Sequence, residues 1–211
     1  PVHRHPETAR GPAFWAVCRY DDVLEVYRDD ERFTSERGNV LSTLLQGGDS
    51  AAGRMLAVTD GHRHREVRKL MLKSFSPRLL THMRESVRAR TRELFDDAMQ
   101  RGTVDFAEHI VDHIPIGTMG ELMDVPVADR QRLVEWNTQT LGRRDADENH
   151  FEEVLARNEI LLYFEDLARH RRKNPGDDVI SALATGLIDG EPLSDEEVVL
   201  NCYSLILGGD E

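Results

Sequence analysis

The apolar positions of the chain recur mostly at helical spacing. Between Tyr20 and Arg28 they fall on one side of a short amphipathic helix. Residues 198–207 are apolar on all sides, which is typical of a buried helix. The short aromatic run at residues 14–18 instead favours a β-strand. The predicted fold is therefore mainly α, with small β fragments.

Capping residues set several helix ends. Ser76 and Pro77 predict an N-cap and a first helical residue, and Gly102 predicts the end of that helix. Ser194 and Glu197 are spaced as a capping box at the start of the last helix. The remaining expected elements are helices at residues 60–74, 107–123, 126–141, 147–173 and 178–184, a short strand at 104–106, and a long, partly helical loop at 33–53.

Composition bounds the class of protein. With 211 residues, 39% of them hydrophobic, we expect a single domain over residues 1–211. The net charge of −12 argues against nucleic-acid binding, whose footprint is basic. We expect a cytoplasmic protein, because no run approaches the ~18 apolar residues of a membrane span and no signal peptide opens the chain.

Cys18 and Cys202 lack disulfide-framework or zinc-site spacing, so we expect two buried thiols.

Charge is unevenly distributed along the chain. Seven basic residues lie between Arg54 and Arg78, against only Asp60 and Glu66. Residues 176–211 contain nine acids and no lysine or arginine. The basic segment is either a solvated helix face or a docking surface for an anionic partner.

His64 and Arg68 are four residues apart, so on a helix their side chains share one face. Such a pair suits a carboxylate or phosphate, since arginine offers a bidentate fork. An exposed basic face without a ligand is the other interpretation. A metal site formed by His62 and His64 is disfavoured, because residues two apart on a helix point away from each other.

The last helix meets Gly208, Gly209, Asp210 and Glu211. Glycines inside a buried helix lower its stability, but they allow a ligand to approach the backbone. Two carboxylates there would serve proton handling. The alternative is that Gly208 simply ends the helix and both acids are exposed.

These features, in this order, resemble the cytochrome P450 family. The strand at 14–18, the following helix and the Phe33-Thr34-Ser35 turn resemble the family's opening. Residues 60–70 resemble its helix C pattern, although Gly61 and His62 replace two prolines, and residues 74–78 resemble the segment that follows. Residues 208–211 resemble the oxygen-activation motif of helix I. The resemblance implies the N-terminal half of the P450 fold, helices B to I.

The resemblance also implies a cofactor, haem b. His64 and Arg68 would hydrogen-bond a haem propionate, and Gly208 and Gly209 would let helix I pass close to the haem face. The cysteine thiolate that ligates the iron is not in this chain, because Cys18 and Cys202 match other positions of the family. Iron in such a site needs the thiolate for O–O cleavage, so these residues alone are not expected to be active.

Further roles follow from the same resemblance. Glu211, next to Asp210, would be the acid that relays protons to bound oxygen. Leu56, Ser204 and Leu207 would contact the substrate. The segments at 40–56 and 141–150 would line the pocket and form its lid.

The implied function is that of a monooxygenase acting on a small organic substrate, with O2 and electrons from NAD(P)H through a redox partner, in bacterial secondary metabolism. A ferredoxin or flavodoxin would dock near a set of basic residues: Arg63, Arg65, Lys69, Lys73 and Arg78. One competing hypothesis is a truncated, non-catalytic helical interaction module. A nucleic-acid-binding regulator is disfavoured by the net charge.

Overall fold

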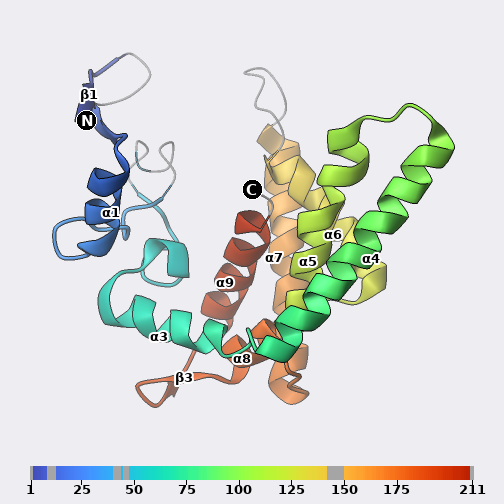
Figure 1. Ribbon diagram of the computed structural model, residues 1–211. Helices are drawn as coiled ribbons and strands as arrows, with labels where there is room; N and C mark the ends of the chain where they lie inside the picture. The colour runs from blue at the N-terminus through green and yellow to red at the C-terminus, as the bar shows by residue number, and fades with distance from the viewer. Residues whose placement is uncertain (1, 9–12, 40–43, 45–47, 142–149, 210–211) are drawn as a thin grey trace. The chain divides into compact units, whose positions relative to one another are not determined.

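The computed structural model describes residues 2–8, 13–39, 44, 48–141 and 150–209 (Figure 1). It divides into two compact units, Pro1–Val67 and Arg68–Glu211. The boundary falls inside one helix, α3 (Gly61–Leu72), which belongs in part to each unit. The expectation of one domain over the whole chain stays a prediction.

The first unit opens with a β-hairpin. Strand β1 pairs antiparallel with β2, with Val2 opposite Val17 and His5 opposite Phe14. The prediction of β2 is confirmed, whereas β1 was not predicted because three of its four side chains are polar. The predicted amphipathic helix is also confirmed. Before α3, this unit contains β1 (Val2–His5), β2 (Phe14–Val17), α1 (Tyr20–Arg28) and the 3₁₀ helix η1 (Leu56–Val58).

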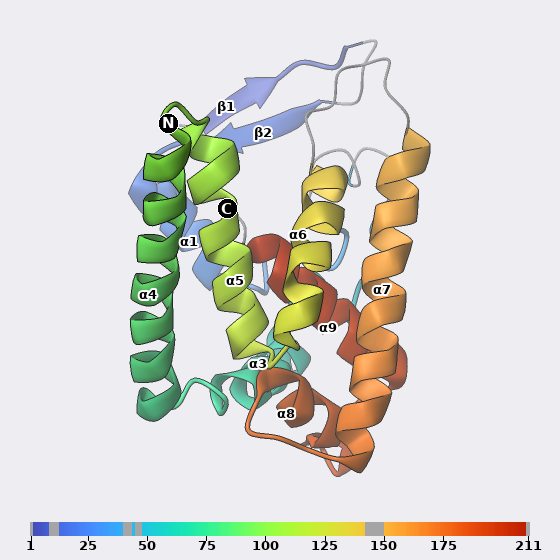
Figure 2. The ribbon, with the colours of Figure 1, turned by 90° about the vertical axis from the view of Figure 1, so that its right-hand side faces the viewer.

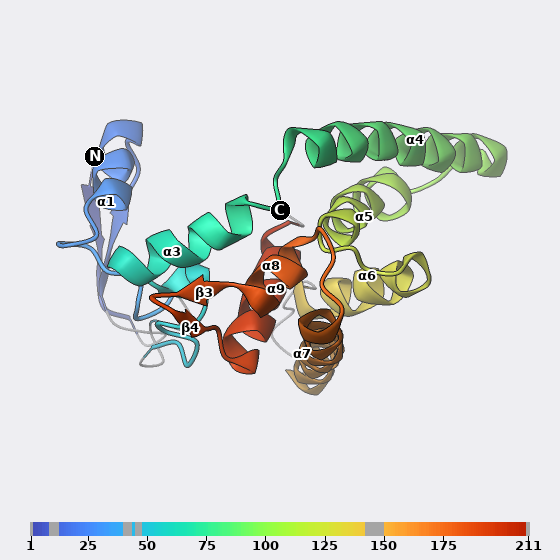
Figure 3. The same cartoon turned by 90° about the horizontal axis from the view of Figure 1, so that it is seen from below.

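The second unit is helical. It contains α4 (Pro77–Arg101), the π-helix η2 (Ala107–Val111), α5 (His113–Leu122), α6 (Val127–Leu141), α7 (His150–Lys173), α8 (Val179–Thr185), β3 (Leu187–Ile188), β4 (Glu191–Pro192) and α9 (Asp195–Gly208). Figure 2 shows α4, α5, α6 and α7 side by side, and each helix contacts the next. Figure 3 views the same row from below. Helix α9 packs against α5, α7 and α8.

The capping predictions are confirmed. The Ser76 hydroxyl accepts a hydrogen bond from the Leu79 amide at 3.1 Å, and α4 ends at Gly102, where φ is +83°. At α9, the Glu197 amide donates to the Ser194 hydroxyl at 3.2 Å, and the Ser194 amide donates to the Glu197 carboxylate at 2.8 Å. In both caps the two hydrogen-bond partners are three residues apart in the sequence, which is why the sequence alone specifies these helix starts.

The predicted strand at 104–106 is wrong. The Asp105 carboxylate instead accepts a hydrogen bond from the Glu108 amide at 3.1 Å, as a helix cap does. The Asp112 amide then donates to the Ala107 carbonyl at 3.0 Å, five residues back, which makes η2 a π-helix. The single helix expected at 107–123 is accordingly broken into η2 and α5.

The core of the second unit is built from regular stripes. On α7, residues Ala156, Ile160 and Phe164 recur every four positions and are at most 2% exposed. On α9, Val198 and Ile206 are likewise fully buried. Buried side chains four apart lie on one helix face, so these stripes fix which side of α9 points into the unit.

Candidate functional site

The start of α3 is held by two aspartates. The Asp60 carboxylate accepts hydrogen bonds from the Thr34 hydroxyl at 2.7 Å and the Ser35 amide at 2.6 Å. The Asp30 carboxylate accepts from the Gly61 amide at 3.2 Å, and it pairs with Arg65 at 3.5 Å. The Phe33-Thr34-Ser35 turn is therefore tied directly to the segment that leads into α3.

Gly61 explains the departure from the family's helix C pattern. Its φ is +59°, in the left-handed region, whereas proline holds φ near −65°. A proline therefore does not fit this backbone, and the two aspartates hold the helix start instead. The pattern Asp60-Gly61-His62 is a different way to enter the same helix.

We expect Gly61→Ala to lower the free energy of unfolding by about 1 kcal/mol, because a side chain at positive φ is strained. A Cβ atom at Gly61 would meet nothing within 4 Å, so the loss reports the backbone alone. Urea unfolding measures the difference. Gly117→Ala is the matched control, because a Cβ there also meets open space and Gly117 lies in α5 at ordinary helical φ. A loss of equal size in both variants would contradict the explanation.

The His64 ring is oriented by backbone carbonyls. Its Nδ1 atom lies 3.0 Å from the Thr59 oxygen and 3.2 Å from the Leu56 oxygen. The ring is half-buried, as is Leu56, which begins η1. Because the bond fixes Nδ1, Nε2 is the nitrogen left for a ligand.

Arg68 lies one turn further along α3. It is exposed, and within the part of the chain that the structure describes it has no hydrogen bond or ion pair. Its five donors are therefore available to an anion. The predicted spacing of His64 and Arg68 on one helix is confirmed by α3, while their predicted ligand stays a prediction.

The other basic residues divide into two groups. Lys73 and Arg78 are exposed and, among the described residues, make no ion pair. Arg65 pairs with Asp30, and Arg63 and Lys69 also have interaction partners. The most available positive charges thus lie at the end of α3 and the start of α4.

Helix α9 has a second face that the unit leaves open. Ser204 and Leu207, predicted to contact substrate, are half-buried, and Leu200 lies on the same side. Gly208 is exposed, and a Cβ atom there would meet nothing within 4 Å. This face is therefore available to a ligand or another part of the protein.

The two glycines of the motif differ in their surroundings. A Cβ atom at Gly209 would collide with the Met119 side chain of α5 and would lie 3.2 Å from the Leu205 oxygen. Any larger residue at 209 would therefore force the Met119 side chain to move. The role predicted for Gly208 at a cofactor remains open to test, as does that of Asp210 and Glu211, which lie outside the described residues.

The other predicted segments are only partly visible. Residues 40–43 and 45–47 of the predicted pocket loop and residues 142–149 of the predicted lid lie outside the described residues. Across the described parts of the chain, no three His, Cys, Asp or Glu side chains could hold a metal ion. In the same parts, no helix is long and apolar enough to cross a membrane.

The two cysteines lie in different surroundings. Cys202 is buried, and its burial, with a smaller effect of the Asp178 charge, raises the pKa of its thiol. A raised pKa keeps the thiol protonated, whereas metals bind thiolates. Cys18 is exposed, so the prediction of two buried thiols is wrong for this residue, which sits just beyond the end of β2.

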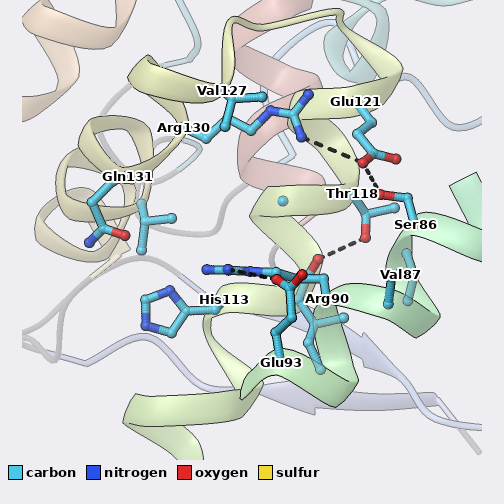
Figure 4. Close-up of a pocket in the computed structure, with 14 residues that line it drawn as sticks. Ser86, Val87, Arg90, Glu93, His113, Thr118, Glu121, Val127, Arg130 and Gln131 are labelled. Carbon is cyan, nitrogen blue, oxygen red and sulfur yellow. Dashed lines mark hydrogen bonds and ion pairs between the residues drawn. The ribbon is translucent and has the colours of Figure 1, made fainter. Parts of the chain in front are cut away.

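A cavity of about 300 Å³ between α4, α5 and α6 was not predicted (Figure 4). In it the Ser86 hydroxyl donates to the Glu121 carboxylate, and Arg130 lies 3.5 Å from the same oxygen. At the other end, Arg90 and Glu93 are 3.5 Å apart. Arg90 and Glu93 pair within α4, three residues apart. The contacts of Glu121 with Ser86 and Arg130 join α5 to α4 and α6, and no local sequence pattern could have revealed them.

Comparisons with known proteins agree with the geometry, although no protein-family model matches the chain. Cytochrome P450 NovI of Streptomyces niveus is 43% identical over 211 residues, which is 100% of this chain and 52% of NovI. Cyclomarin C epoxidase CymV of Salinispora arenicola is 33% identical over 215 residues, 99% of this chain and 53% of CymV.

A solved structure shows the same fold. The crystal structure of P450 OxyD, described as involved in the biosynthesis of vancomycin-type antibiotics, superposes with a TM-score of 0.82 at 28% identity. The match covers 100% of this chain and 52% of OxyD. The chain thus has the fold of the amino-terminal half of a haem-thiolate protein. It belongs to the cytochrome P450 family, and it spans about half the length of the relatives it matches.

Proposed function

We propose that the intact protein is a haem-dependent monooxygenase, which hydroxylates or otherwise oxidises a small organic substrate with O2. Electrons would come from NAD(P)H through a separate redox partner. The observation that carries the proposal is the match to NovI along 100% of the chain. The printed functions of CymV, an epoxidase, and OxyD, in antibiotic biosynthesis, support a place in bacterial secondary metabolism.

The residues of α3 fit a haem b propionate. His64 leaves Nε2 free, and the unpaired guanidinium of Arg68 lies one turn away on the same helix. When bound, the haem and its cysteine thiolate, supplied by the rest of the protein, would provide the oxygen chemistry. The role of His64 and Arg68 is to neutralise and orient a carboxylate.

The open face of α9 would cover the reaction site. Ser204 and Leu207, with Leu56, would contact the substrate and displace water. At Gly208 the absence of a side chain would allow close approach to the helix. Glu211, next to Asp210, would hold and deliver the proton that the reaction consumes.

The absorbance of the intact protein, after reduction and addition of carbon monoxide, tests the proposal. Thiolate-ligated haem would give the long-wavelength Soret band for which the family is named. A protein of full length that binds no haem would overturn it. That result would instead favour the competing hypothesis, a non-catalytic helical interaction module.

A ferredoxin or flavodoxin would dock on the basic surface that includes Arg63, Arg65, Lys69, Lys73 and Arg78. In the double variant Lys73→Glu/Arg78→Glu, we expect the rate of reduction by such a donor to fall about tenfold at low ionic strength, since opposite charges steer association. Stopped-flow reduction measures the rate. Arg84→Glu/Arg88→Glu changes the net charge equally on exposed residues of α4. Equal losses in both double variants would show a general charge effect and contradict a local dock.

A further inference from the structure

The bonds of His64 restrict its protonation. Nδ1 faces two carbonyl oxygens, those of Thr59 and Leu56, at 3.0 and 3.2 Å. A carbonyl oxygen only accepts hydrogen bonds, so Nδ1 must carry a hydrogen. A neutral imidazole has one N–H, and Nε2 of neutral His64 is therefore an acceptor with a lone pair.

An ionised carboxylate is also only an acceptor. If a propionate met neutral His64, two lone pairs would face each other and no hydrogen bond would form. Rotating the ring so that Nδ1–H faces the ligand would break the hydrogen bond to Thr59. The Thr59 carbonyl would then lose its hydrogen-bond donor in a partly buried position. The imidazolium form alone donates to the backbone and to the ligand together.

The charged neighbours of His64 on its helix offer its Nε2 atom no acceptor. One turn before it, the Asp60 carboxylate is occupied by Thr34 and Ser35. One turn after it lies the exposed guanidinium of Arg68, which can only donate hydrogen bonds. Within the described residues, the His64 ring has no other hydrogen bond and no ion pair, so no carboxylate of these parts neutralises it.

We propose that His64 takes up one proton from solvent when the haem carboxylate binds, and that it is a doubly donating imidazolium in the haem-bound protein. The inference rests on the proposed function and goes beyond it, because it assigns the form in which this positioning residue acts. The new N–H bond forms at Nε2, and an O–H bond of the hydronium ion that donates the proton breaks, which leaves water. Binding that takes up a proton is strongest at low pH and weakens as the pH rises.

Nitrogen NMR of the intact protein tests the protonation directly. The protein would carry ¹⁵N-labelled histidine and be observed in the diamagnetic ferrous carbon monoxide form, with His64→Gln used to assign the signals. We expect both ring nitrogens of His64 to show the shifts of an imidazolium. One nitrogen with the shift of an unprotonated ring position would overturn the proposal.

Transfer of haem from the ferric protein to excess apomyoglobin provides a second readout that does not depend on activity. We expect the wild-type release rate to rise about tenfold between about pH 6 and pH 8, as a charge-assisted hydrogen bond is lost. His64→Gln keeps a neutral N–H donor, so its rate should change little over that range. An equal pH dependence in both proteins would overturn the proposal, whereas failure of the intact protein to bind haem would overturn the proposed function itself.

Discussion

Replacing Asp178 with alanine is expected to lower the free energy of unfolding by about 2 to 3 kcal/mol. The carboxylate is 3% exposed and caps α8. It accepts hydrogen bonds from the Ser181 amide at 2.9 Å and the Ser181 hydroxyl at 2.6 Å. Arg171 lies 3.4 Å away as its ion-pair partner. Alanine would leave the amide and the hydroxyl of Ser181 without their acceptor. Arg171 would lose one of its two carboxylate partners and keep its pair with Asp124, so the two lost hydrogen bonds of the helix cap account for most of the effect.

Urea unfolding followed by circular dichroism measures the loss. Asp178→Asn is the matched control, because asparagine caps a helix nearly as well but carries no charge. We expect it to lose about 1 kcal/mol, mainly from the ion pair with Arg171. If alanine and asparagine had the same small effect, Asp178 would contribute little to the junction between α7 and α8.

Local rules account for the parts of the fold that were predicted correctly. The caps at Ser76 and Ser194 join residues three apart, so the sequence contains both partners. Strand β1 was missed because its pairing with β2, not its exposed polar side chains, makes it a strand. The error at 104–106 has a similar cause: a polar residue, Asp105, between the apolar Val104 and Phe106 suggested a strand, but no partner strand exists among the described residues to pair with it.

In the candidate site, too, local features could be predicted and long-range contacts could not. The four-residue spacing of His64 and Arg68 was enough to place them on one helix face. The carbonyls that orient the His64 ring could not be predicted, because they depend on the path of the chain through η1. The two glycines looked equivalent in the sequence, yet Met119, ninety residues earlier, distinguishes them.

That difference leads to opposite expectations for neighbouring substitutions. Gly209→Ala is expected to lower the free energy of unfolding by about 2 kcal/mol, because its Cβ would collide with the Met119 side chain. Gly208→Ala adds a methyl group into open space near the end of a helix, so it is expected to raise stability by about 0.5 kcal/mol. The same chemical change one residue apart thus has the opposite sign.

A double-mutant cycle separates packing from backbone effects. The double variant Met119→Ala/Gly209→Ala removes the colliding side chain, so the Gly209→Ala loss should largely disappear when measured in the Met119→Ala background. If the loss persisted there, the clash with α5 would not be its cause.

In the intact protein, Gly208→Ala should weaken haem or substrate binding despite its added stability, because the proposed function places a ligand on the open face of α9. A glycine whose replacement stabilises the fold but weakens binding would serve the ligand and not the fold.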